Sequence, residues 1–497
     1  MKYFRSLLTL CVSLAMLPNL SNAEEILQVP GKMFNAEQES LQTFPPSLRL
    51  PPVTIPKRAG RSATAIAAPS VSEVVLPELS VTELQQMQAA GEEKNTRVGL
   101  GRDLPETLNA VSAWQWNAVA GGMVAHMKLT STNAKRVRVL LRMGELPQGA
   151  ELRFYAPQDL ANVMGPYGHA AMQTQPKDTD NKTLFWSPSI EGDTLGMEVF
   201  LPNTAQVSDL DMRIERLSHV VIDPISGEVQ ESYLKATTQA DTFACQIDVA
   251  CEASPGLQIQ SKAVAGYFFT TELGETSFCT GTLLNNYSDD GTPYFLTANH
   301  CINDEKKSAS MEFSWFFASS GCNANDGNTL IKRTYLGSQL LAKRPEADST
   351  LLQLNQAPPA GVVFSGWSAN GMPPASAVAG IHHSGFASLV LNAVITWPQK
   401  YSQGYVIGNG RNPLDEQTTT TLPFDSEGEF AYVQWTKGVA LAGGSGSALL
   451  MQDKGNYFVT GVLLGGSSSC ANPTGIDYYG RLDKSFATFK PWLTKRR

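Results

Sequence analysis

Hydrophobic and polar residues alternate in short runs along the second half of the chain. From about residue 236 onward these runs include "GYFFTT", "SFCTGTLL", "PYFLTA", "AYVQW" and "YFVTGVLLGG", each bounded by turn-forming residues. This spacing predicts short strands that build paired β-barrels or a large sandwich. The last segment, "KSFATFKPWL", places Phe486, Phe489 and Leu493 at helical spacing. The chain is therefore expected to end in a helix packed on the body.

The first half has a different pattern. Between about residues 105 and 225, alternating runs such as "RVRVLLRM" and "AELRFYAP" predict a small β-sandwich. The range 24–95 before it has seven prolines between Pro45 and Pro77, a composition that predicts an extended linker. Within that range, Ser80 and Glu83 have capping-box spacing and predict a short helix.

Composition supports an all-β, multidomain protein. A chain of 497 residues exceeds what one hydrophobic core usually organises. A charged fraction of 17%, with 41 glycines and 29 prolines, is typical of a globular, loop-rich protein. The net charge of -8 argues against nucleic acid as a partner.

The first residues predict export. Lys2 and Arg5 precede the apolar run "LLTLCVSLAML", and "SNA" places small residues before a cleavage point after Ala23. This is the layout of a secretory signal peptide, and the run is shorter than a membrane span needs. We expect a secreted protein that has no membrane association once residues 1–23 are removed.

The number of cysteines is consistent with export. Removal of the signal peptide also removes Cys11, which leaves an even set of six in an oxidising compartment. Three disulfides are expected, and spacing alone leaves fifteen pairings open. The six are Cys245, Cys251, Cys279, Cys301, Cys322 and Cys470.

Three short segments carry the candidate chemistry. His300 ends "PYFLTANH", Asp348 opens "DSTLLQL", and Ser445 lies in the glycine-rich "AGGSGSA". Acyl transfer by serine needs a base, an acid that orients the base, and donors for the oxyanion. The order His, Asp, Ser is that of the chymotrypsin class, and the intervals of 48 and 97 residues lie close to those of chymotrypsin.

Glycines around the serine have a mechanical role. Gly443 and Gly446 allow a tight turn in which the N–H groups of Ser445 and Gly443 converge on one oxygen. Ser447 is the competing nucleophile. A glycine-serine run alone is usually a flexible loop, so the prediction depends on the three segments taken together.

Two other classes of function compete with this prediction. The first half resembles an adhesive β-domain, so the alternative is a catalytically inactive homologue that acts as a secreted binding protein. A zinc site from His300, His382, His383 and cysteines is the second rival. Because the cysteines are committed to disulfides and no metal-type spacing occurs, we expect neither a metal nor another cofactor.

The second half resembles the secreted trypsin-like serine proteases, and most of all the bacterial lysyl endopeptidases. The likeness runs over residues 240–495 and rests on "FCTGTLLNN", "YFLTANHC", "GIHHSG" and "GGSGSA". It implies a double β-barrel with a C-terminal helix. It also implies the disulfides Cys245 to Cys470, Cys251 to Cys322 and Cys279 to Cys301.

Substrate preference follows from the same resemblance. In "GGSSSCANPTGIDYYGR", Asp477 takes the place of the aspartate in that family's specificity pocket. With Gly465 and Gly466 it implies binding of a basic side chain, lysine or arginine, because a buried carboxylate favours a cationic partner. Leu464 stands where the family has a histidine, and Ala448 replaces its proline.

Domain order predicts a proenzyme. We expect a signal peptide at 1–23, a proline-rich pro-region at 24–95, a β-rich pro-domain at 96–235 and a protease domain at 236–497. The pro-domain is expected to act as an intramolecular chaperone or inhibitor. Lys235 is a site that the enzyme could cut itself. Gly444 stands where animal trypsins have the carboxylate that pairs with their freed terminal amine.

Overall fold

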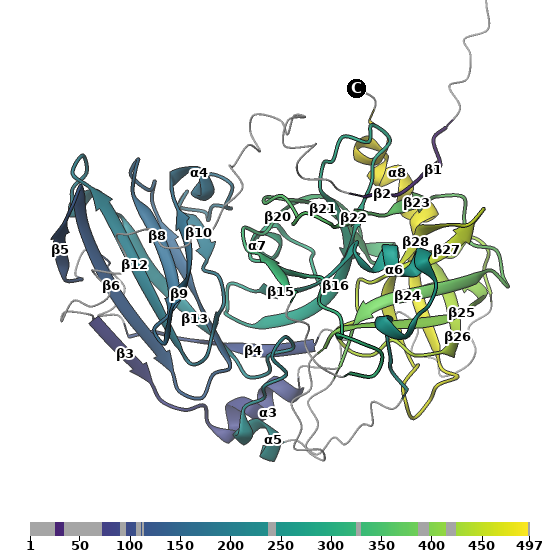
Figure 1. The fold of residues 1–497 in the computed structure, drawn as a ribbon, viewed down its shortest axis with the longest axis horizontal. Coiled ribbons are helices and arrows are strands. Elements are labelled where there is room, and N and C mark those ends of the chain that lie inside the picture. Colours follow the sequence, from purple (N-terminus) through teal and green to yellow (C-terminus); the bar gives the residue numbers. More distant parts are fainter. Residues whose placement is uncertain are drawn as a thin grey trace, which may run out of the picture.

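The computed structural model describes residues 25–33, 72–89, 96–105, 111, 114–236, 245–324, 330–385, 397–413 and 424–495. Figure 1 shows two regions side by side. We call residues 72–236 the N-terminal domain and residues 245–495 the C-terminal body. The signal peptide predicted for residues 1–23 lies outside the described residues.

Two sheets face one another in the N-terminal domain. One has the order β3-β6-β12-β8-β9, with β5 on β6. Its strands are Ser72–Leu76, Gly122–Ser131, Thr194–Pro202, Glu151–Ala156, Asp159–Tyr167 and Trp116–Val119 (β5). The other contains β10 (Thr183–Trp186), β7 (Arg136–Met143), β11 (Ile190–Glu191), β13 (Met212–Val220) and β4 (Thr96–Arg102). A core of apolar side chains between them makes a β-sandwich.

The first half of the C-terminal body is a half-barrel. Its strands follow the order β19-β18-β15-β16-β17-β21-β20. They are Lys332–Thr334, Glu312–Trp315, Val264–Thr270, Thr276–Leu284, Tyr294–Ala298, Ser349–Leu354 and Ser338–Arg344. Every residue of β15 is buried, as expected for a strand with apolar neighbours on both faces.

The second half closes into a barrel. Its strands run β28-β27-β24-β25-β26-β29, and β29 pairs back onto β28. They are Asn456–Gly466, Ala448–Asp453, Ala377–His383, Gln399–Gly410, Phe430–Lys437 and Ile476–Arg481. The predicted terminal helix is α8 (Leu482–Leu493), which buries Phe486, Phe489 and Leu493. This arrangement confirms the double-barrel, all-β fold with a C-terminal helix.

The two regions share one sheet. Strand β4 of the N-terminal domain pairs with β13 on one side and with β16 of the half-barrel on the other. Figure 1 shows β4 crossing from the sandwich toward β16. The main chain is thus hydrogen-bonded across the boundary between the two regions.

The range 24–95 also contributes ordered elements. Strand β3 pairs with β6, and β1 (Gln28–Val29) and β2 (Lys32–Met33) pair with strands of the C-terminal body. The predicted helix is α3 (Val81–Ala89), and Ser80 and Glu83 form the expected cap, with the Ser80 N–H donating to Glu83 at 2.7 Å. Among the described residues, no helix is long and apolar enough to cross a membrane.

Candidate active site

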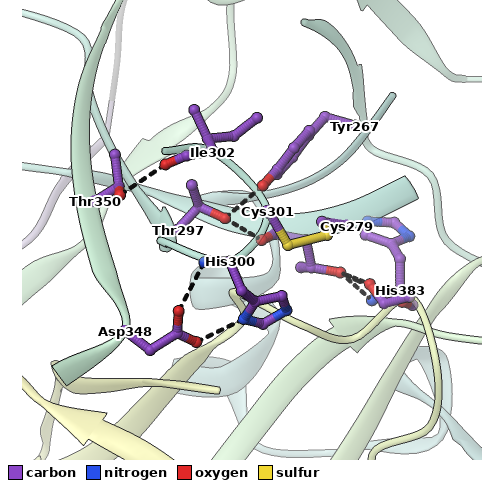
Figure 2. The surroundings of a disulfide bond; sticks show 11 residues. Tyr267, Cys279, Thr297, His300, Cys301, Ile302, Asp348, Thr350 and His383 are labelled. Carbon is purple, nitrogen blue, oxygen red and sulfur yellow. Dashed lines mark hydrogen bonds and ion pairs between the residues drawn. A yellow bond between two sulfur atoms is a disulfide. The ribbon is translucent and has the colours of Figure 1, made fainter. Parts of the chain in front are cut away.

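His300 and Asp348 meet at one end of the half-barrel. Strand β17 ends two residues before His300, and its pairing with β21 sets Ala298 opposite Ser349, the residue after Asp348. The Asp348 carboxylate accepts a hydrogen bond from the backbone N–H of His300 and faces His300 Nδ1, both at 2.7 Å (Figure 2). Two contacts to one carboxylate fix both the position and the ring orientation of the imidazole.

Asp348 owes its position to an unusual backbone conformation. It follows the 3-10 turn Pro345–Ala347 and has φ 42° and ψ 45°, in the left-handed region. Its side chain is 6% exposed and that of His300 is 19% exposed. The carboxylate is therefore shielded, while the imidazole keeps access to solvent.

The cysteine after His300 ties this segment to β16. The structure contains Cys279–Cys301, and also Cys245–Cys470 and Cys251–Cys322, the pairs that the resemblance implied. Figure 2 shows the Cys279–Cys301 bridge beside His300. Thr350 donates to the carbonyl oxygen of Ile302 at 2.8 Å and holds the following residue. His300 thus sits in a segment fixed on both sides.

Ser445 lies in a turn that packs against the end of β17, close to His300. A Cβ atom added at Gly446, which has φ 85°, would lie 2.2 Å from Thr297 Oγ1 and 2.9 Å from Ala298 N. Only glycine permits this approach to the end of β17. Thr280 on β16 donates its N–H to the Ser445 carbonyl oxygen at 2.9 Å. The structure therefore brings the serine turn beside the segment that carries His300.

Gly443 forms the other half of this turn. It has φ 88°, and an added Cβ would lie 3.0 Å from the His383 carbonyl oxygen. The Ala442 carbonyl accepts from Gly385 N–H at 3.2 Å. Because a trans peptide sets N–H and C=O in opposite directions, the Gly443 N–H points away from Gly385. The Gly443 N–H is thus a candidate donor to an oxyanion.

Ser447, the competing nucleophile, is fully buried at the start of β27. Its N–H donates to the Gly444 carbonyl at 3.0 Å, and its carbonyl accepts from Leu463 N–H at 2.9 Å. It serves as an anchor of the turn within the second barrel. Ser445 is also largely buried, but it lies on the side of the turn that faces the half-barrel.

Asp477 lies on β29 with 1% of its surface exposed. Its carboxylate accepts from Trp435 Nε1 at 2.7 Å and from the Ser468 hydroxyl at 2.6 Å, which are neutral donors. Gly466 pairs with Asp477, and an added Cβ at Gly466 would lie 2.2 Å from Asp477 Oδ1. Gly465 has φ 151°. These contacts put the three predicted substrate-binding residues together at the junction of β28 and β29.

The Ser468 hydroxyl links Asp477 to the serine turn. Ser468 Oγ also contacts the Ala440 carbonyl oxygen at 3.4 Å, and Ala440 lies five residues before Ser445. Leu464, at the family's histidine position, is 6% exposed and packs with Phe430 and Tyr432. The departure from the family therefore places an apolar side chain beside the candidate pocket.

His382 and His383 are buried structural residues of β24. Burial lowers the pKa of His382 to about 3 and that of His383 to about 4, so both rings are neutral. His383 Nδ1 contacts the Trp397 carbonyl oxygen at 3.0 Å. In the described part of the chain, no three His, Cys, Asp or Glu residues gather as a metal site would require.

Three supporting residues of the candidate site were not predicted from the sequence. Thr280 holds the serine turn, and Trp435 and Ser468 hold Asp477. Thr280 directly follows Cys279 and could have been suspected from that position. Trp435 and Ser468 carried no local signal, because their role depends on how β26 and β29 pair.

The fold and two matches to family models define the class of this protein. The double barrel with a His-Asp pair beside a glycine-rich serine turn is the architecture of trypsin-like proteases. The family model described as "Lysyl endopeptidase, C-terminal domain" matches residues 239–480, and "Lysyl endopeptidase N-terminal domain" matches residues 75–221. The chain therefore belongs with the lysyl endopeptidase-like proteases.

Known proteases are similar to this chain to different extents. The lysyl endopeptidase of Pseudomonas aeruginosa is 28% identical over 483 residues, which cover 95% of this chain and 94% of that protein. A solved HtrA-type protease with a tripeptide is 16% identical with a TM-score of 0.30. That match covers 48% of this chain and 62% of the solved chain.

Proposed function

We propose that this protein is a secreted serine endopeptidase that cleaves peptide bonds after basic residues, through a Ser445-His300-Asp348 triad and an acyl-enzyme. The observation that carries the proposal is the double contact of Asp348 with His300, made beside a serine turn that Gly446 seats against β17. The name of the related P. aeruginosa protein supports the preference for lysine. Arginine is the other basic side chain to be tested.

Each residue has a role in the proposed reaction. Ser445 Oγ attacks the carbonyl carbon while His300 accepts its proton at Nε2, and Asp348 stabilises the imidazolium through Nδ1. The N–H groups of Gly443 and Ser445 bind the oxyanion. His300 returns the proton to the leaving amine, the C–N bond breaks, and water then hydrolyses the ester by the same route.

Asp477 is the proposed anchor for the basic side chain. Its described donors are Trp435 Nε1 and the hydroxyl and N–H of Ser468, and together they orient the carboxylate. A lysine ammonium that reached it would form a desolvated ion pair. Neutral side chains would leave the carboxylate without that partner, so preference for a basic side chain follows.

We further propose that the N-terminal domain inhibits the uncleaved chain. Asp477 and Gly466 would bind the substrate residue before the scissile bond. The leaving group would then lie on the other side of Ser445, where the Thr280 N–H donates to the Ser445 carbonyl oxygen. There β4 pairs Thr96 with Phe278, two residues from Thr280. A peptide strand that left through this edge would compete with β4.

Apolar packing reinforces that contact. Val98 and the stretch Val220–Ile222 of the N-terminal domain share a core with Phe278 and Trp397. The backbone N–H of Trp397 also donates to the Pro224 carbonyl oxygen at 2.8 Å. The N-terminal domain thus covers the surface beside the leaving-group edge.

A buried charge supports the chaperone role. Arg138 of β7 is 1% exposed, donates to the Ser310 carbonyl oxygen at 2.9 Å, and lies 3.4 Å from Glu312 of β18. Ser189 of the N-terminal domain donates to Glu312 as well, at 2.6 Å. The Glu312 carboxylate therefore has partners in the N-terminal domain as well as Arg333 of the half-barrel, at 2.7 Å, so the N-terminal domain would favour folding of the half-barrel.

Export and activation complete the proposal. The signal-like segment 1–23 supports secretion, and Lys235 in α5 (Glu231–Ala236) is the proposed activation site. Because that residue lies in a helix, cleavage needs the end of α5 to unwind. Amino-terminal sequencing of the secreted product from the wild type and from Ser445→Ala would reveal whether the enzyme cuts itself.

The decisive experiment separates an enzyme from an inactive homologue. A fluorophosphonate probe should label the wild type at Ser445 and should not label Ser445→Ala. Digestion of a peptide mixture should give new carboxyl ends at lysine or arginine. A wild type that is neither labelled nor active would favour the secreted binding protein instead.

A further inference from the structure

A short amino-terminal segment is built into the C-terminal body. We call residues 25–33 the strap; it contains β1 and β2 and lies outside both family-matched ranges, 75–221 and 239–480. Figure 1 shows β1 and β2 beside α8 and β23, whereas β3 lies in the N-terminal sheet. The strap therefore contacts a different region from the elements that follow it in the chain.

Backbone pairing continues along the strap. Strand β1 pairs antiparallel with β23 (Gly366–Ser368), which pairs with β28 of the second barrel. Strand β2 pairs with β22 (Val363–Phe364). Between the two, the Leu27 carbonyl accepts from Ala369 N–H at 2.7 Å. The strap thus extends the sheet that includes the strands flanking Ser445.

Side chains of the strap enter the main core. Val29 is 4% exposed and belongs to the apolar cluster that also contains Trp367 and α8 side chains. Ile26 and Leu27 pack against the same cluster. Met33, by contrast, is 58% exposed. One face of the strap is a core face and the other faces solvent.

The surface beneath the strap is shaped for close approach. An added Cβ at Gly366 would lie 2.7 Å from both Gly31 N and Val29 O. Any side chain at Gly366 would push the strap away. The absence of a Cβ there lets the two backbones lie at hydrogen-bonding distance.

Polar contacts fasten the strap along its length. Asn285 donates its amide to the Pro30 carbonyl at 2.9 Å, and Lys32 Nζ donates to the Asp289 carbonyl at 3.0 Å. At the other end, Glu25 pairs with Lys490 of α8 at 2.5 Å. Charged contacts at both ends and a buried valine between them define the register.

We propose that the strap is a component of the C-terminal body that stays bound without a covalent link when the N-terminal domain is cut away, so that the processed protein consists of two chains. The surface of β22, β23 and Asn285 is then a peptide-binding site whose occupant is residues 25–33 of this chain. The natural cuts rest on the proposed peptidase function, but retention of the strap does not.

The test uses the full chain with Ser445→Ala, so that its own activity plays no part. Recognition sequences for an added site-specific protease are inserted between residues 34 and 71 and between 237 and 244. After digestion and gel filtration, denaturing mass spectrometry should find the strap peptide in equal amount with the C-terminal body. A strap peptide that elutes apart from the C-terminal body overturns the proposal.

Matched variants separate burial from added charge. Val29→Asp should abolish co-elution and lower the unfolding temperature of the digested body by at least about 5 °C. Met33→Asp adds the same charge at an exposed position and should retain the strap. Should Val29→Asp fail to fold, Val29→Ala should show a partial loss of strap. Equal retention in the two aspartate variants would contradict the proposal.

Discussion

Thr280 on β16 donates its backbone N–H to the carbonyl oxygen of Ser445 at 2.9 Å. Its hydroxyl also donates to the Gly443 carbonyl at 2.9 Å and accepts from His383 N–H at 3.0 Å. One residue of the half-barrel therefore holds both the candidate nucleophile and the candidate oxyanion turn, which belong to the second barrel.

Thr280→Val should expose this role. The substitution keeps the shape but leaves the Gly443 carbonyl and His383 N–H without the buried hydroxyl, at a cost of about 1–3 kcal/mol. We expect kcat/KM on a lysyl peptide to fall about 10- to 100-fold, with slower fluorophosphonate labelling. Thr280→Ser restores the hydroxyl and should stay near the wild type. Equal rates for the two variants would contradict this role.

Asp348→Asn tests the orientation of His300. The asparagine keeps the size of the side chain but cannot stabilise an imidazolium, and the corresponding change in the Ser-His-Asp class costs about 10⁴-fold in rate. We expect a loss of kcat/KM of that order with little change in unfolding temperature. Glu346→Gln is the control, because its 61% exposed carboxylate lies two residues away. If both variants keep full activity, the triad assignment is wrong.

Asp477→Asn tests the specificity pocket. Removal of one partner of a buried ion pair costs about 3–5 kcal/mol, so kcat/KM for lysyl and arginyl peptides should fall by at least about 100-fold. Peptides with a neutral side chain before the scissile bond serve as the internal control and should not be affected. A uniform loss across all substrates would indicate damage to the fold instead.

Local patterns were enough to find the fold class and the segments that meet at the site. "YFLTANHC" predicted a buried strand up to His300, and the structure has this strand as β17, which ends at Ala298. Phe486, Phe489 and Leu493 predicted the terminal helix, which the structure confirms as α8. Both predictions rest on the periodicity of neighbouring residues. Such patterns can be detected in the sequence because each buried position of a strand or helix favours an apolar side chain.

The pairing of strands that are far apart in the chain could not be predicted from the sequence. Strand β4 joins β16 across about 180 positions, and β1 joins β23 across about 340. A two-residue strand such as β1 has no period to detect, and the prolines of the range 24–95 dominate its composition. Pairing partners depend on the assembled sheets, so no local signal encodes them.

Inhibition by the N-terminal domain predicts a difference between substrates. In an uncleaved chain carrying Lys235→Gln, a lysyl ester with no residues after the scissile bond should be hydrolysed. A quenched peptide with four residues after that bond should be cut at least about 10-fold more slowly than by the processed enzyme, because β4 occupies the leaving-group edge. The measurement is kcat/KM for both substrates on both forms.

Val98→Asp should relieve this inhibition. Val98 is fully buried in the core shared with Phe278, so a carboxylate there should separate β4 from β16 and restore cleavage of the long peptide. Val75→Asp is the control, because Val75 is 62% exposed in the same domain. Equal slowing of short and long substrates in the uncleaved chain would rule out occlusion of the leaving-group side.

Three buried histidines predict how stability depends on pH. Burial lowers the pKa of His219 to about 4, as it lowers those of His382 and His383. An unfolded histidine has a pKa of about 6.5, so below that pH the unfolded chain binds more protons than the folded one. The free energy of unfolding should therefore fall as the pH drops from about 6.5 toward 4.5, by up to about 1.4 kcal/mol per unit for each histidine.

Thermal unfolding of the Ser445→Ala chain between pH 7.5 and 4.5 checks this prediction. These histidines add no slope above about pH 6.5, where both states leave them neutral. His382→Asn can still accept the contact that Ser384 makes with Nδ1 at 2.8 Å, but it does not titrate. It should flatten the acid slope by about a third. His219→Asn should do the same for the N-terminal domain, and a slope unchanged by either variant would show that other groups control acid unfolding.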